Sequence, residues 1–152
     1  MGKIYVEKNH IEKAHIEKIH MENPPCPAVI EKWIDDSEVS GCIRAYMFRL
    51  DEGGSVLITG GSRTHVGAFS RTAPGRDTET IQFPGHKDGV VSSHWSETLC
   101  RVLGEPFSVE GGIHFDGLSK NGIGLVVQIC GEMLEEACRF YKSCESDGTS
   151  VV

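Results

Sequence analysis

Three short segments of the chain combine glycine with a single histidine. They are residues 59–67, 84–89 and 111–117. Glycine permits a positive φ and lets the main chain approach a ligand closely, so that successive N–H groups can converge on an anion. We take the polar residues and glycines of these segments as candidates for one binding site: Gly60, Gly61, Arg63, His65, Gly67, Gly85, His86, Lys87, Gly112, His114 and Asp116.

Two cationic side chains in these segments favour a phosphate as the anion. Arg63 offers a planar fork of donors, and Lys87 offers a point charge. Residues 84–87 also directly precede a predicted helix, whose first N–H groups attract such an anion. The sequence contains neither the G-x-G-x-x-G nor the G-x-x-x-x-G-K-[ST] nucleotide motif. A tight turn or bulge is the simpler interpretation of any one segment, whereas three such segments together favour a shared site.

The imidazoles of His65, His86 and His114 have three interpretations. They can ligate a divalent metal, because three histidines form one of the zinc sets found in enzymes. They can contact a polar cofactor, or they can be structural residues with ordinary hydrogen-bond partners. We favour contact with a cofactor and keep metal ligation by these three residues as an alternative. Asp116 either orients His114 or caps the turn that follows, and capping is the simpler interpretation.

No arrangement for covalent catalysis stands out in the sequence. Cys100 lies in an apolar helical stretch, where a thiolate is disfavoured, and Ser62 and Ser70 lack an elbow motif. The six cysteines include no C-x-x-C pair, so we expect reduced thiols that pack as small apolar groups. The sequence therefore gives no support to classical covalent catalysis.

Hydrophobic patterning predicts the elements that must position these segments. Strands are expected over residues 42–50, 55–59, 65–70, 78–83 and 107–115. Helices are expected over residues 88–103, ended by Gly104, and from Ser119 to about residue 144. Four strands, a helix, a strand and a helix predict an α+β fold, in which helices pack on a mostly antiparallel sheet.

The two ends of the chain differ from this central part. Residues 1–25 carry a five-residue echo of His-Ile-Glu-Lys, which builds no apolar stripe and predicts a flexible tail. Met21 is a hypothetical natural start. Residues 26–40 are predicted as a short helical extension that packs on the domain as a lid. Residues 41–144 are predicted as the α+β domain, and residues 145–152 as a frayed C-terminus.

Composition sets broad limits on function. The chain has 152 residues and a formal net charge of -7, which argues for one domain and against a broad surface for nucleic acid or anionic lipid. No apolar run reaches the length of a membrane span, and the first residues lack the apolar stretch of a secretory signal. We therefore expect a cytoplasmic protein.

The same segments, in this order, resemble the LpdD-like prenylated-flavin chaperones, the small D subunit that accompanies UbiD-type hydroxyarylic acid decarboxylases. The resemblance spans about residues 41–142. It is carried by Thr59-Gly-Gly-x-x-x-His65-Val-Gly-Ala68, Pro84-Gly-His-Lys-Asp88, the Leu103-Gly104 helix end and Gly112-Ile-His-Phe-Asp116. The family is similar in fold to the proteasome assembly chaperones, in which a sheet is flanked by helices and the chains commonly form dimers.

The resemblance implies a homodimeric carrier rather than an enzyme. Its cargo would be prenylated FMN, or FMN itself, received from a flavin prenyltransferase and delivered to a UbiD-type decarboxylase. The candidate residues of the three segments would hold this cargo. Two alternatives stay open: a metal-dependent enzyme that uses His65, His86 and His114, and an assembly scaffold with no small-molecule site.

Overall fold

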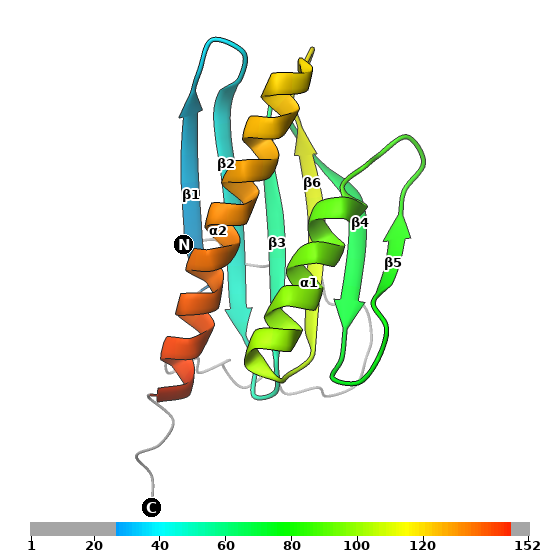
Figure 1. Ribbon diagram of the computed structural model, residues 1–152, viewed down its shortest axis with the longest axis vertical. Helices are drawn as coiled ribbons and strands as arrows, with labels where there is room; N and C mark the ends of the chain where they lie inside the picture. Colours follow the sequence, from blue (N-terminus) through cyan, green and yellow to red (C-terminus); the bar gives the residue numbers. More distant parts are fainter. Residues whose placement is uncertain (1–26, 147–152) are drawn as a thin grey trace, which may run out of the picture.

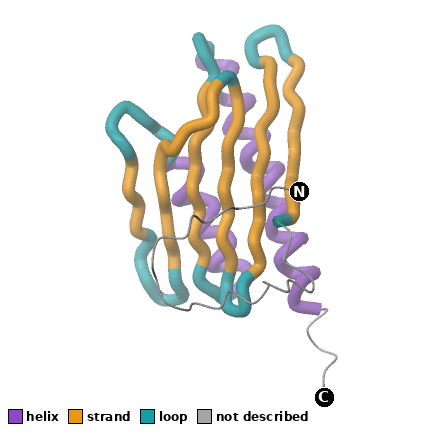
Figure 2. Tube along the Cα trace, turned by 180° about the vertical axis from the view of Figure 1, so that it is seen from behind, coloured by secondary structure: helices purple, strands orange, loops and turns teal. Residues whose placement is uncertain are grey.

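The sheet and helices are seen in a computed structural model that describes residues 27–146. Six strands form one sheet, and both helices pack on the same face of it (Figure 1 and Figure 2). The predicted α+β fold with a mostly antiparallel sheet is confirmed. The predicted tail, residues 1–25, and residues 147–152 lie outside the described residues.

The strand order is β1-β2-β3-β6-β4-β5. Only β3 and β6 pair in parallel, and the other four neighbouring pairs are antiparallel. The strands are β1 Ala28–Asp35, β2 Ser40–Arg49, β3 Gly54–Gly61, β4 Arg63–Thr72, β5 Glu79–Gln82 and β6 Phe107–His114. The five strands that the sequence predicts are present, and each agrees with the prediction to within a few residues.

Two helices cover one face of this sheet. α1, Gly89–Leu103, packs on β4 and β6, and α2, Lys120–Ser146, packs on β1 and β2. The predicted caps are present: Gly104 adopts a left-handed conformation after α1, and the Ser119 hydroxyl accepts a 3.0 Å hydrogen bond from the Gly122 N–H. α2 continues through residues 145 and 146, which corrects the predicted start of the frayed end. Neither helix combines the length and apolarity needed to cross a lipid bilayer.

The core lies between the sheet and the two helices. It is built from alternate residues of the strands, which point to one face, and from the apolar stripes of the helices. Its largest fully buried side chains are Ile43, Met47, Ile58, Trp95, Leu99, Phe107, Met133 and Tyr141. Close to α1 the packing becomes polar, because buried hydroxyls pair across the layers: Ser70 with Ser92 at 2.8 Å, and Thr72 with Ser96 at 2.9 Å.

The predicted helical extension over residues 26–40 is wrong, because residues 28–35 form the edge strand β1. Ile30 and Ile34 face the core, while Val29 and Trp33 lie on the opposite face and are exposed. Apolar residues at i, i+1, i+4 and i+5 fit one side of a helix, but they equally fit a strand that is apolar on both faces. β1 pairs with β2 along its whole length, so this segment belongs to the domain and is no lid.

Glycines in β4 and β6 allow the start of α1 to lie directly against the sheet. The register of β4 against β6 shifts between Thr64 and Ala68. A Cβ at Gly67, within this shift, would lie 2.1 Å from Oδ2 of Asp88, the residue before α1. A Cβ at Gly112 would lie 1.6 Å from the carbonyl oxygen of His65. The absent side chains therefore create the space in which the residues before α1 meet β4 and β6.

We expect Gly67→Ala to destabilise the fold by about 1–3 kcal/mol, because the new methyl group overlaps the Asp88 carboxylate and the surrounding chain must shift. Urea denaturation measures the change in the free energy of unfolding. Gly124→Ala is the matched control, since a Cβ at this position in α2 meets nothing within 4 Å. Alanine there should stabilise the helix by about 0.5–1 kcal/mol. Equal effects of the two substitutions would contradict the packing role of Gly67.

Candidate functional site

A cleft of about 300 Å³ opens where the start of α1, the end of β6 and the first turns of α2 meet. Its polar side carries His65, His86, Lys87, Asp88 and His114. Its apolar side is formed mainly by Val91, Ile113, Phe115, Leu118, Ile123, Val126 and Val127. The cleft therefore offers hydrogen-bonding and charged groups, its polar side, and an apolar wall that is aliphatic except for Phe115, its aliphatic side.

The structure brings the three predicted histidines together at the polar side. His65 comes from the irregular part of β4, His86 from the loop before α1, and His114 from the last position of β6. The rings of His65 and His86 are stacked, with centroids 4.4 Å apart and planes 25° from parallel. The ring of His114 is edge-on to that of His65, with centroids 6.1 Å apart. Three segments distant in the sequence thus meet at one place.

A tight loop carries His86 over His65. Gly85 has a φ of 81°, and the His86 N–H donates a 3.2 Å hydrogen bond to the Phe83 carbonyl. The Phe83 N–H in turn donates to the carbonyl of Gly67 at 3.0 Å, which ties the loop to β4. Positive φ favours glycine at position 85, and the absence of any atom within 4 Å of a built Cβ shows that space is not the constraint there.

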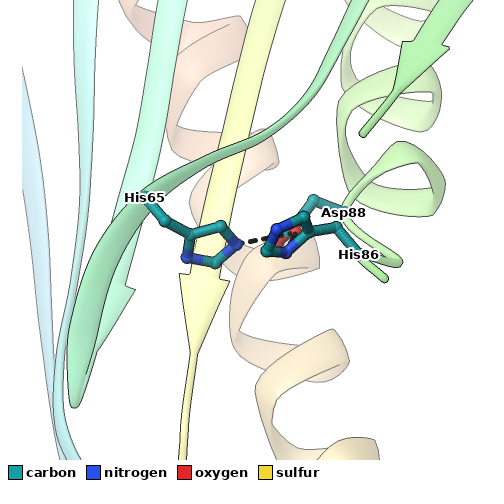
Figure 3. Close-up of side chains that lie close together, drawn as sticks. All are labelled: His65, His86 and Asp88. Atoms are coloured by element: carbon teal, nitrogen blue, oxygen red, sulfur yellow. Dashed lines mark hydrogen bonds and ion pairs between the residues drawn. The ribbon is translucent and has the colours of Figure 1, made fainter. Parts of the chain in front are cut away.

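Asp88 is the central residue of the site, and the sequence analysis did not select it. Its Oδ2 lies 3.1 Å from Nε2 of His65 and 3.9 Å from Nδ1 of His86 (Figure 3). Its Oδ1 accepts a 2.9 Å hydrogen bond from the Ile113 N–H. The side chain is only 9% exposed. Two sequence signals pointed to it: its place at the start of a predicted helix, where aspartate usually indicates a capping residue, and its place in the motif Pro84-Gly-His-Lys-Asp88. Its side chain makes no capping hydrogen bond.

The predicted metal set of three histidines is not the group that the structure assembles. Ligand atoms of His65, His86 and Asp88 all lie within 4.8 Å of one another. The Nε2 atom of His114 is instead engaged at the rim, 2.9 Å from Asp116 Oδ1 and 3.1 Å from Arg63 Nη2. Among the described residues, the group of potential metal ligands therefore contains Asp88 and not His114.

The Asp116 carboxylate contacts His114, at 2.9 Å from its Nε2, so the structure favours the orienting role over the capping role that the sequence favoured. A hydrogen bond from His114 holds the pKa of the Asp116 carboxyl below its usual range, and the charges of His114 and Arg63 act in the same direction. One ring nitrogen cannot donate to Asp116 and accept from Arg63 at the same time, and the shorter contact, 2.9 Å to the Asp116 carboxylate, is one in which the ring nitrogen donates. Arg63 then contacts Asp116 through charge, at 3.9 Å. Arg63 is mostly exposed and does not line the cleft, whereas Lys87 does.

Most of the predicted site glycines lie within strands rather than in open loops. Gly60 and Gly61 end β3, and a Cβ at Gly61 would lie 2.0 Å from the His114 carbonyl oxygen. Gly67 and Gly112 occupy the close contacts between β4, β6 and Asp88 described above. Gly85 is the one predicted glycine that lines the cleft. The others shape the site through close approach of the backbone.

The start of α1 is not open to an anion, which corrects that expectation. The Gly89 N–H donates to the side chain of Gln82 at 3.1 Å. The N–H groups of Val91 and Ser92 donate to the Asp88 carbonyl at 3.1 and 3.0 Å. These groups already have partners, and the adjacent Asp88 carboxylate repels a second negative charge. An anion in the cleft would therefore meet Lys87 and the imidazoles rather than this helix end.

The thiols of the described residues show no sign of nucleophilic activation. Cys42, Cys100, Cys130, Cys138 and Cys144 are all free. Burial, with a smaller contribution from the Asp88 charge, raises the pKa of the Cys130 thiol to about 12. Burial also raises the pKa values of Cys42, Cys100 and Cys138. A thiol with a raised pKa stays protonated at neutral pH and is a poor nucleophile.

The chain was compared with known proteins. The family model described as the prenylated flavin chaperone LpdD-like domain matches residues 37–142. Protein LpdD of Lactiplantibacillus plantarum is 27% identical over 70 residues, which are 43% of this chain and 52% of that protein. The match thus spans about half the length of this relative. A crystal structure of a chaperone complex for yeast 20S proteasome assembly aligns with a TM-score of 0.48 and 12% identity, over 78% of this chain and 97% of that chain.

The family match includes every segment that lines the cleft, from His65 to Val127. It also covers the Gly- and His-containing segments on which the resemblance was based. The chain therefore belongs to the LpdD-like prenylated flavin chaperone family.

Proposed function

We propose that this chaperone binds prenylated FMN in the cleft and delivers it to a UbiD-type decarboxylase. The observation that carries the proposal is the division of the cleft into a polar and an aliphatic side, in a chain of the prenylated flavin chaperone family. A prenylated flavin has a matching division, since its ring system is large and apolar while its phosphate is charged. FMN, which shares the phosphate and most of the ring system, is expected to bind more weakly.

The aliphatic side of the cleft suits the ring system of the cargo. Ile123 and Val127 lie on successive turns of α2 and are 52% and 53% exposed, so a ligand that covers them removes apolar surface from water. A volume of about 300 Å³ lies at the small end of the range for ligand sites. Such a cleft holds part of the cargo and leaves the rest accessible, as a carrier that must release its cargo requires.

The polar side of the cleft suits the phosphate. Lys87 is exposed and lines the cleft, and it has no ion pair among the described residues. His65, His86 and His114 add ring N–H groups close to it. Arg63, by contrast, contacts Asp116 at the rim and does not line the cleft, so we give the phosphate contact to Lys87.

The partners in this proposal are the enzyme that makes the cargo and the enzyme that uses it. A flavin prenyltransferase supplies the cargo and the decarboxylase receives it, both in the cytoplasm. The carrier itself does no chemistry on the cargo.

We further propose that the carrier is a homodimer formed through the sheet face that the helices leave uncovered (Figure 2). One row of paired residues crosses all six strands, and in each strand it alternates with residues of the core face. The row is apolar except at one central position: Val29, Tyr46, Leu57, Glu110, Phe69 and Ile81. A second copy presents the same apolar row, which makes the face self-complementary.

We expect Val127→Glu to weaken binding of prenylated FMN at least ~10-fold, because the new carboxylate must be desolvated against the ring system. Absorbance or fluorescence titration of the purified protein with FMN and prenylated FMN measures the two affinities. Val90→Glu is the matched control, since Val90 is a more exposed valine, on α1, and does not line the cleft. If the unmodified protein binds neither flavin, the proposal fails and the assembly scaffold becomes the better interpretation.

Lys87→Ala should weaken binding of FMN at least ~10-fold and leave binding of riboflavin unchanged, because riboflavin lacks the phosphate that the ammonium group contacts. The same titration measures both ligands. Lys142→Ala, which removes an exposed lysine of α2 outside the cleft, serves as the control. Equal losses of FMN and riboflavin affinity would show that Lys87 has another role.

Ile81→Glu should convert the homodimer to a monomer. The substitution places a carboxylate at the exposed end of the apolar row, and dimer formation would then bury this charge against the second copy. Light scattering coupled to size-exclusion chromatography measures the mass in solution. Val90→Glu adds the same charge on the helical face and should leave the dimer intact. A monomeric unmodified protein, or a dimer that survives Ile81→Glu, would contradict this interface.

A further inference from the structure

We infer that His65, His86 and Asp88 bind one divalent transition-metal ion at the polar side of the cleft. Each residue offers one ligand atom, and these three atoms all lie within 4.8 Å of one another. Nε2 of His65 and Nδ1 of His86 both face Oδ2 of Asp88. The ligand set consists of two imidazoles and one carboxylate. It differs from the set of three histidines that the sequence offered as an alternative metal site, and it uses Asp88, a residue that the proposed cargo contacts do not need.

The distances among these atoms fit a common ion. Ligands bound tetrahedrally at about 2.0–2.1 Å lie roughly 3.3–3.4 Å from one another. His65 Nε2 and Asp88 Oδ2 are 3.1 Å apart, and His86 Nδ1 and Asp88 Oδ2 are 3.9 Å apart. The first pair needs almost no adjustment. His86 must move closer to the other two ligands and turn out of its stack with His65, because a metal ion lies near the plane of each imidazole that binds it. His86 lies in the loop before α1, where such a movement disturbs no strand pairing.

The carboxylate is already held in position for this role. Asp88 Oδ1 accepts the hydrogen bond from the Ile113 N–H, which leaves Oδ2 directed toward the two imidazoles (Figure 3). Partners of this kind orient metal ligands and raise affinity. Gly67 provides the space that Oδ2 occupies, since a Cβ there would lie 2.1 Å from this oxygen. The ligands are 19%, 34% and 9% exposed for His65, His86 and Asp88, so the group is sheltered yet open to an ion from solvent.

The ligand types indicate the class of ion. Imidazole nitrogen suits Zn²⁺, Co²⁺ and Fe²⁺, whereas Ca²⁺ and Mg²⁺ prefer shells made of oxygen. Three protein ligands leave at least one coordination position vacant. Because all three residues line the cleft, this position is available to water or to an oxygen of a bound molecule. The inference does not rest on the proposed cargo, since the ion can be measured on protein that carries no flavin.

The test uses the full chain with His10, His15 and His20 changed to glutamine, because the His-rich N-terminal sequence can bind metal by itself. The probes are Zn²⁺, measured by calorimetry and by elemental analysis after dialysis, and Co²⁺, measured by its visible absorption. We expect one ion per chain, with a Co²⁺ spectrum typical of four- or five-fold coordination. Less than half an ion per chain at saturating Zn²⁺ would overturn the inference.

Single substitutions identify the ligands. Asp88→Asn and His86→Ala should each lower Zn²⁺ affinity at least ~10-fold, the lower limit expected even for residues that only support metal ligands. His86 is half-exposed in a loop, so its substitution tests the site even if Asp88→Asn disturbs folding, which circular dichroism monitors. His94→Gln, an exposed histidine of α1 outside the group, is the control. Unchanged affinity in His86→Ala, or an equal loss in His94→Gln, would overturn the assignment.

Discussion

The contact on which the site depends is the bridge that the Asp88 carboxylate makes from the start of α1 to the sheet. One oxygen accepts the N–H of Ile113 in β6, and the other lies against His65 in β4. A buried carboxylate is stable only where its oxygens have partners, and these partners are supplied by two strands. The bridge fixes where α1 begins relative to β4 and β6. The position of α1 in turn sets the loop with His86 and Lys87, and hence the polar side of the cleft.

The sequence predicted most of the fold because its strands and helices carry strong local signals. The left-handed Gly104 and the Ser119 cap each have a local physical cause, and each is present. β1 escaped prediction for an equally physical reason. Val29 and Trp33 are apolar although they face away from the core, and this removes the polar alternation by which a half-buried strand is recognised. Its pairing with β2 depends on tertiary structure, so a short stretch of sequence does not reveal it.

The site was only partly predictable. Glycine and histidine recur together in three segments, and this pattern correctly led to His65, His86 and His114 as neighbours. The same pattern predicted an anion-binding role for Gly67 and Gly112. In the structure, the absence of a side chain at Gly67 leaves room for the Asp88 carboxylate, and its absence at Gly112 leaves room for the His65 carbonyl. Asp88 was missed because an aspartate before a helix has a common local explanation. Its actual partners, Ile113 and His65, are respectively 25 and 23 residues away along the chain, so that only the folded sheet reveals them.

The position of β6 has a consequence for biosynthesis. This strand lies between β3 and β4 in the sheet but follows both of them in the chain. Until it emerges from the ribosome, β3 and β4 each expose an unpaired edge, and such edges promote aggregation. Ile113 and the walls supplied by α2 are also synthesised after these strands. A nascent chain therefore has no complete cleft until β6 and α2 have been translated and β6 has inserted into the centre of the sheet.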